Sequence, residues 1–171
     1  MNGVRRVNSR LASAVALSLW LGAVLVVGAI VAPAAFAVLP TRTLAGALVG
    51  RVLPTLFWSG AAVGVLLAIL GRTDQSARTR TFLGLAVTVS CLAAQLVVAP
   101  RIARVRADVA VPIERLARDD ARRVAFGRLH AASVALLGVA ALSGAAALFF
   151  TMRALTGRND RHGISNPPHR P

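Results

Sequence analysis

The stretch VAPAAFAVLP, Val31 to Pro40, allows two interpretations of the N-terminal segment. Its Ala35-Phe36-Ala37 has the small-x-small pattern of a signal-peptidase site and follows a charged start and a long apolar run. The apolar region of a signal peptide is usually about 7–15 residues long, whereas a membrane helix needs roughly 20. The uncharged run here extends from Leu11 to Thr41. Its length therefore favours a retained membrane helix over a cleaved leader.

Three further uncharged runs follow, and each is long enough to cross a bilayer. The sequence thus predicts an all-α integral membrane four-helix bundle, with spans at about 11–39, 52–71, 81–100 and 129–152. Pro40 prevents smooth continuation of the first helix, and Thr41 or Thr43 is a suitable cap for a second helix beginning near Leu44. Pro100 is expected to perturb the end of the third helix.

The charged segment before the fourth span has a helical pattern of its own. Pro112 suits a first helical turn, and Glu114/Arg118 and Asp119/Arg123 have the spacing of i,i+4 ion pairs. We expect one long helix from about Pro112 to Met152, whose charged first part extends out of the bilayer. Residues 1–153 then form a single transmembrane domain, and residues 154–171 form a disordered polar tail.

Composition supports a membrane protein and argues against a nucleic-acid partner. The chain of 171 residues is 56% hydrophobic with a net charge of +14, and its basic residues are all arginines. These arginines flank the apolar runs, where arginine side chains anchor to lipid headgroups. The single cysteine, Cys91, allows no internal disulfide and no thiolate metal cluster within one chain.

The total number of arginines does not decide the orientation, because each side of the predicted topology holds ten arginines. The prediction therefore depends on the arginines nearest the first helix. The arginines before the first span and the short loop at 71–80 carry the most weight and favour both termini in the cytoplasm. The Ala-, Arg- and Gly-rich composition indicates a GC-rich bacterial genome, and hence the bacterial plasma membrane.

Small and polar residues mark helix faces inside the predicted bundle. Two GxxxG patterns, Gly46/Gly50 and Gly60/Gly64, are typical of close helix packing, either within the chain or between copies in a homo-oligomer. On the third helix, one face carries Gly84, Thr88, Cys91 and Gln95. This face predicts interhelical hydrogen bonds or, as the alternative, a polar lining for a small solute or ion.

The topology gathers several polar side chains at one end of the bundle. The second helix starts, the third ends and the fourth starts there, which brings together Arg51, Gln95, Arg101, Arg128 and His130. Ionisable groups near a membrane boundary indicate a binding site. As its candidate residues we take Arg51, Gln95, Arg101 and His130. The simpler interpretation is that the arginines reach toward headgroups and His130 is an interfacial hydrogen-bonding residue.

These residues also carry a family resemblance. The stretches VAPAAFAVLP, AGALVGRVLPTLFW, APRI at 99–102 and FGRLHAASVALL at 126–137, in this order, resemble bacterial domain of unknown function 4149. Animal relatives of that family are similar to transmembrane protein 205. The resemblance implies a four-helix membrane protein and no established biochemical activity. It maps family-like positions onto Pro33, Phe36, Gly46, Arg51, Pro54, Pro100, Arg101, Phe126 and His130.

Three classes of function are compatible with the sequence. The first is a non-enzymatic membrane protein that contacts a membrane protein partner. The second binds or transports a small solute or ion through the polar face of the third helix. The third handles haem or copper, for which the ligand pool is His130, Cys91 and Met152. We predict no catalytic residues, no metal site and no cofactor, because no Walker, GxSxG or HExxH sequence occurs.

Overall fold

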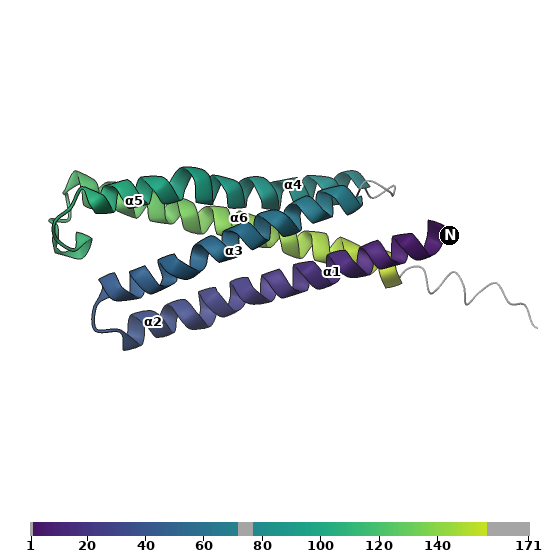
Figure 1. Cartoon of the computed structure of the whole chain (residues 1–171), viewed down its shortest axis with the longest axis horizontal. Coiled ribbons are helices and arrows are strands. Elements are labelled where there is room, and N and C mark those ends of the chain that lie inside the picture. The colour runs from purple at the N-terminus through teal and green to yellow at the C-terminus, as the bar shows by residue number, and fades with distance from the viewer. Residues whose placement is uncertain (1, 72–76, 157–171) are drawn as a thin grey trace, which may run out of the picture.

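The computed structural model describes residues 2–71 and 77–156, and the regular elements in these ranges are all helices. Four stretches are long and apolar enough to cross a membrane: Val7–Val38, Arg42–Leu70, Arg78–Ala107 and Ala121–Thr156 (Figure 1). The predicted all-α four-helix bundle is therefore confirmed. Residues 157–171, most of the predicted polar tail, lie outside the described residues, and the last helix continues to Thr156.

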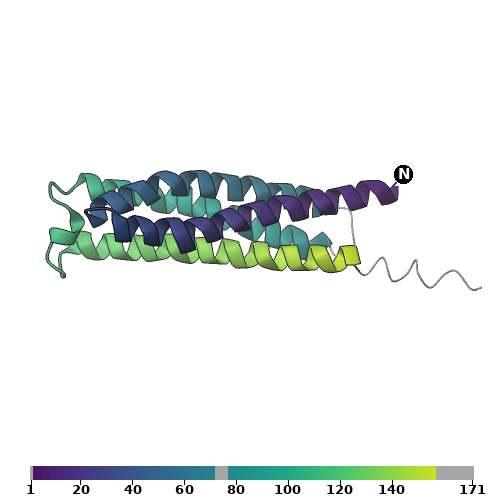
Figure 2. The same ribbon diagram turned by 90° about the horizontal axis from the view of Figure 1, so that it is seen from below.

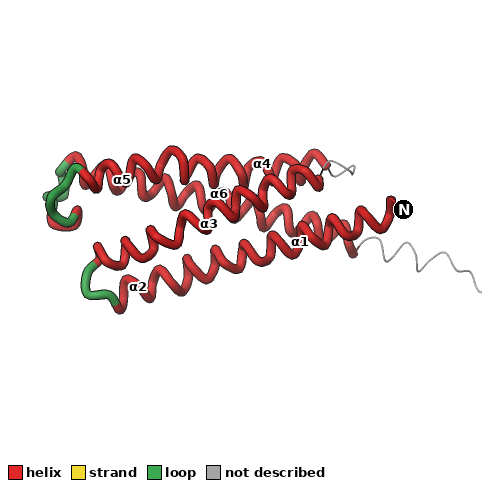
Figure 3. The backbone as a smooth tube through the Cα atoms, viewed as in Figure 1, coloured by secondary structure: helices red, strands yellow, loops and turns green. Residues whose placement is uncertain are grey.

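The four long helices form a ring. Helix α1 (Asn2–Val26) packs against α3 (Arg42–Gly71) and α6 (Ala121–Thr156), and α4 (Ala77–Ala93) packs against the same two. The N-terminus of α1 and the C-terminal end of α6 lie at one end of the bundle, which we call the terminal end (Figures 1 and 2). The opposite end holds the loops at 39–41 and 108–120, green in Figure 3 except for a short helical turn at 113–115, and is called the loop end.

The first span begins earlier than the predicted Leu11. Helix α1 starts at Asn2 and continues through a π-helical turn, η1 (Val27–Val31), into α2 (Ala32–Val38). The residues before Leu11 contain no proline, so nothing in this segment interrupts the helix. Helix α2 contains the Ala35-Phe36-Ala37 pattern and ends at Leu39, which is extended at φ −76° and ψ 142°. That conformation is expected of a residue that precedes a proline.

The third span continues past Pro100, contrary to the prediction that it ends there. A π-helical turn, η2 (Ala94–Val98), follows α4 and leads into α5 (Ala99–Ala107). The Ala99 N–H donates to the Ala94 carbonyl, five residues back. The ring of a proline clashes with the carbonyl four residues earlier, and a widened π turn relieves this clash. A π turn also precedes Pro33, where the Ala32 N–H donates to Val27.

Helix α3 begins at Arg42, slightly before the predicted Leu44. The Thr41 hydroxyl accepts a hydrogen bond from the Leu44 N–H at 3.2 Å, so Thr41 provides the cap. The helix then runs through Pro54 to Gly71 without a break. Helix α4 begins at Ala77, ahead of the predicted Thr81, while residues 72–76 of the intervening loop lie outside the described residues.

The prediction of a helix from Pro112 is wrong. Pro112 is extended at ψ 135°, and only one 3₁₀ turn, η3 (Ile113–Arg115), follows before Leu116 becomes extended. Helix α6 begins at Ala121, so the charged helical extension before the fourth span is shorter than expected. The predicted Glu114/Arg118 and Asp119/Arg123 pairs do not form, because these residues are not on one continuous helix. Arg122 instead pairs with Asp120 at 2.8 Å.

The middle of the bundle is closely packed. A Cβ atom built on Gly64 would lie 2.6 Å from the Gly84 carbonyl oxygen, so the backbones of α3 and α4 meet at these two glycines. Trp20 of α1 is buried, its ring covers Gly60, and its indole N–H donates to the Leu56 carbonyl at 3.0 Å. Glycines allow helices to approach this closely because they present no side chain.

Candidate functional site

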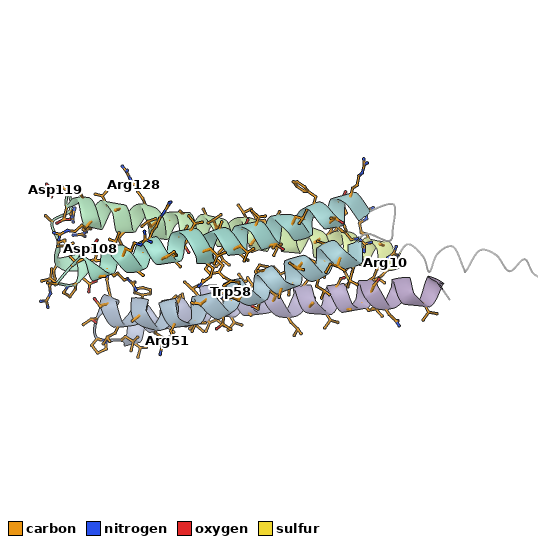
Figure 4. All side chains as sticks on the ribbon, turned by 45° about the horizontal axis from the view of Figure 1, so that its top comes forward. Arg10, Arg51, Trp58, Asp108, Asp119 and Arg128 are labelled. Atoms are coloured by element: carbon orange, nitrogen blue, oxygen red, sulfur yellow. The ribbon has the colours of Figure 1, made fainter. Side chains whose placement is uncertain are left out.

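The predicted site residues lie on three helices that meet at the loop end. Arg51, Arg101 and His130 are exposed, and Gln95 is partly buried in η2. In the part of the chain that the structure describes, no hydrogen bond, ion pair or ring contact joins any two of these four. Figure 4 shows Arg51 and Arg128 projecting from opposite sides of the bundle. The topology therefore gathers these residues toward one end, and Arg51 and Arg128 point in different directions there.

A different arginine, Arg106, joins three helices at the loop end. Its guanidinium lies 5.3 Å from the centre of the Phe126 ring. Its Nη2 and Nη1 atoms would lie 3.5 and 3.9 Å from Cβ atoms built on Gly46 and Gly50. Phe126 in turn stacks on His130, with ring centres 6.2 Å apart and an angle of 8° between the planes. We call Gly46, Gly50, Arg106, Phe126 and His130 the Arg106 cluster.

The local fold explains how this cluster forms. Because the third span continues beyond Pro100, its last turn reaches the level of the first turns of α3, where the two glycines lie. Figure 1 shows α3 beside α4 in the middle of the bundle and diverging from α5 toward the loop end. The long Arg106 side chain spans this separation. Phe126 and His130 follow one another by one turn near the start of α6 and so share a face.

The loop at 108–120 is held by hydrogen bonds of its own. The Thr43 hydroxyl donates to Glu114 Oε1 at 2.8 Å, which ties the loop to α3. Arg123 Nη1 donates to the Leu116 carbonyl at 2.6 Å. Asp120 caps α6, since its Oδ1 accepts the backbone N–H of Arg122 at 2.9 Å. The side-chain hydrogen bond from the same arginine is the main cause that lowers the pKa of Asp120 to about 2.

The loop end carries a strong positive charge. The two segments at this end, residues 42–51 and 101–128, contain ten arginines and the four carboxylates Asp108, Glu114, Asp119 and Asp120, an excess of six positive charges. Glu114 and Asp120 are engaged with Thr43 and Arg122. Within the described residues, Arg106 makes no hydrogen bond or ion pair, and its side chain is exposed. The cluster is therefore a cationic site without an internal counter-ion.

The polar face of the third span has a structural use in this fold. Gly84 contacts Gly64, and Cys91 is fully buried in the core. The Thr88 hydroxyl donates to the Gly84 carbonyl at 3.0 Å and lies 3.4 Å from the Ala61 carbonyl on α3. On α6, the buried Thr151 hydroxyl likewise donates to Ala147 at 2.7 Å. The two threonine hydroxyls are therefore satisfied by backbone carbonyls, and both side chains are buried.

The candidate metal ligands are far apart in the fold. Cys91 is buried in the core of the bundle, whereas His130 is exposed near the start of α6. Met152, the third member of the predicted pool, lies near the terminal end of α6. Among residues 2–71 and 77–156, no three His, Cys, Asp or Glu side chains are grouped so that they could hold a metal ion.

Arg106 was not among the predicted site residues, because the third helix was expected to end at Pro100. Once that helix is continued, Arg106 falls in its last turn, at the level of the first turns of the neighbouring α3. The Gly46/Gly50 pair was expected to pack against another helix, whereas its neighbour in the structure is the guanidinium group of Arg106. The sequence did contain a signal for this contact. It consisted of an arginine near the end of one span and a glycine pair near the start of the adjacent span.

Comparison with known proteins identifies one family. The family described as "Domain of unknown function (DUF4149)" matches residues 15–110, more than half of the chain. The match covers most of the first span and all of the second and third, together with Gly46, Gly50 and Arg106, and it ends before Phe126 and His130. No curated protein and no solved structure matches the chain. The resemblance drawn from the order of the motifs is confirmed, and the chain belongs to the DUF4149 family.

Proposed function

We propose that this DUF4149 protein is a non-enzymatic, multi-pass protein of the bacterial plasma membrane that contacts a membrane protein partner through its loop end. The observation that carries the proposal is the contrast between interior and end. The middle of the bundle is filled, with the backbones of Gly64 and Gly84 in contact. The loop end instead presents charged side chains on its surface, and the excess of arginine is not neutralised by the residues that the structure describes.

The packed interior weighs against solute transport by a single copy. A path along the polar face of the third span would pass Thr88 and Cys91, which are both buried in the core. Trp20 lies across the same region, in contact with Gly60. Transport would then need a path formed between several copies, as a homo-oligomer would provide.

Site-specific photo-crosslinking in the native membrane tests the proposed contact. A photoreactive amino acid at Arg115, in the loop, reports on the loop end, and one at Phe82, an exposed residue in α4, is the control. We expect a discrete protein adduct from position 115 and none from position 82. Two outcomes would replace this proposal with the transport function. One is equal adducts at both positions. The other is no adduct at position 115 together with solute flux in liposomes that hold the purified protein.

The orientation of the chain has its own test. We propose that both termini are cytoplasmic, which places the loop end on the opposite side of the membrane. The only cysteine, Cys91, is buried and gives little background in thiol labelling. A cysteine at Asn8 and another at Arg115 lie near opposite ends of the bundle. An impermeant maleimide added to intact cells is expected to label position 115 and not position 8, and the reverse pattern would invert the topology.

A further inference from the structure

The Arg106 guanidinium is held in place by surfaces that leave its hydrogen-bonding edge unused. One contact is the Phe126 ring, whose centre lies 5.3 Å from the guanidinium carbon, within cation–π distance. The other is the backbone of α3 at Gly46 and Gly50, where no side chain intervenes. Neither contact is a hydrogen bond, and a guanidinium is a planar array of N–H donors. The described residues supply no acceptor to Arg106.

The depth of the cluster corresponds to the headgroup layer. The charge-free runs of α3 and of the third span end at Arg51 and Arg101 on this side. Gly46 precedes Arg51 by five residues and Arg106 follows Arg101 by five. At a rise of about 1.5 Å per residue, both lie roughly 7 Å outside the apolar layer. The polar layer of a bilayer extends about 5–8 Å beyond the hydrocarbon core on each side.

We propose that the Arg106 cluster binds the phosphate group of an anionic phospholipid. A guanidinium matches a phosphate in planar, bidentate geometry, and the phosphates of the bilayer lie at the depth of this cluster. The surrounding excess of arginine, with Arg104 on the same helix, attracts an anion and is not neutralised within the described residues. This inference concerns lipid and does not depend on the proposed protein partner.

Lipid titration of the purified full-length protein by native mass spectrometry provides the test. Phosphatidylglycerol is the anionic probe and phosphatidylcholine the zwitterionic control. We compare Arg106→Gln with Arg104→Gln, which removes the same charge from the same helix two residues away. Gly46→Leu is the second variant, because it retains Arg106 and fills the space beside its guanidinium. Circular dichroism and size-exclusion chromatography show that each variant is folded.

We expect Arg106→Gln to weaken phosphatidylglycerol binding about tenfold, the effect of losing one charged hydrogen-bonding group. Gly46→Leu should cause a similar loss, whereas Arg104→Gln should cause less than about a twofold loss, as for an exposed charge. Equal losses in the Arg106 and Arg104 variants would overturn the proposal, because they would indicate a diffuse basic surface. Unchanged binding in Arg106→Gln would also overturn it.

Inorganic phosphate distinguishes the lipid from an anion in solution. We expect phosphate at millimolar concentration to leave one bound phosphatidylglycerol in place, since acyl chains keep the lipid phosphate at the cluster. If phosphate displaces the lipid from the wild-type protein and has no effect on Arg106→Gln, the cluster binds a free phosphate and the lipid assignment is wrong. Chloride at the same ionic strength is the control for screening.

Discussion

Helix α3 carries the same glycine pattern twice, and its two copies have different surroundings. At Gly60 and Gly64, near the middle of the bundle, a Cβ atom would lie within 2.7 Å of the Trp20 ring and 2.6 Å of the Gly84 carbonyl oxygen. At Gly46 and Gly50, near the loop end, the nearest atoms are the guanidinium nitrogens of Arg106, at 3.5 and 3.9 Å. The first pattern holds helices together, and the second makes room for a charged side chain.

A GxxxG pattern therefore provides space beside a helix, and the surrounding fold determines which group occupies that space. In the middle of the bundle, apolar helices continue on all sides, so backbone and ring atoms fill the space. At the loop end, α3 diverges from α5, and a long side chain reaches across (Figure 1). Because the two occupants differ in rigidity, substitutions at the two copies should differ in sign and size.

The largest effect is expected from Gly64→Ala. The new Cβ would lie 2.6 Å from the Gly84 carbonyl oxygen and 2.8 Å from the Thr88 backbone nitrogen, and neither atom moves without displacing a helix. Overpacking of this kind costs about 1–3 kcal/mol, and we expect the upper part of that range. Reversible unfolding in mixed detergent micelles measures the change. Gly22→Ala is the control, because no atom lies within 4 Å of its Cβ position.

If Gly64→Ala were no less stable than the Gly22 control, the close contact between α3 and α4 would be refuted. The alternative of a polar path beside the third span would then regain support.

The second effect concerns Trp20, which covers the same glycine pattern. Trp20→Phe removes the indole donor to the Leu56 carbonyl and leaves a space beside Gly60. We expect a loss of about 1–2 kcal/mol in the free energy of unfolding, from the lost hydrogen bond and reduced packing. Trp58→Phe is the matched control, since Trp58 is 50% exposed, and it should change stability by less than about 0.5 kcal/mol. Equal losses in both variants would contradict a central position of Trp20.

Fold class and helix number were predictable because they depend on apolar run length. The four uncharged runs correspond to the four membrane-capable helices, and Thr41 caps α3 as its position suggested. Helix ends were less predictable, since a helix can either end before a proline or continue through it. Pro40 follows the end of a helix, whereas Pro100 is accommodated by a π turn, which depends on neighbours that no local pattern reports.

The candidate site was predictable only at the level of topology. The sequence indicated which polar residues reach the loop end, and one of them, His130, is part of the Arg106 cluster through its stacking on Phe126. It did not indicate in which direction each side chain points. Arg51 and Arg128, for example, project from opposite sides of the bundle (Figure 4). The direction of a side chain depends on the rotation of its helix about the helix axis, which run length does not report. Arg106 was missed for another reason, because the third helix was expected to end at Pro100.

A smaller effect, at low pH, tests the order of the loop end. The pKa of Asp120 is about 2 in the folded chain, below the roughly 3.9 of an unfolded aspartate. A lowered folded pKa stabilises the fold above the unfolded pKa, and this contribution is lost as pH falls from about 4 through 2. Asp120→Asn retains a cap acceptor without the charge. Thermal unfolding from pH 6 to 2 should therefore show the wild type losing its advantage over this variant, and a constant difference would contradict the Asp120–Arg122 pair.

The smallest effect is expected from Gly50→Ala, and its sign is the informative quantity. Alanine favours a helix over glycine by about 1 kcal/mol in exposed positions. The new Cβ would lie 3.9 Å from Arg106 Nη1, an ordinary contact with the end of a flexible side chain. We therefore expect the free energy of unfolding to remain unchanged or to rise by up to about 1 kcal/mol. A loss comparable to that of Gly64→Ala would mean that a rigid surface packs on Gly50. The two glycine patterns would then have the same role, and the space around Arg106 would be too small for a phosphate group.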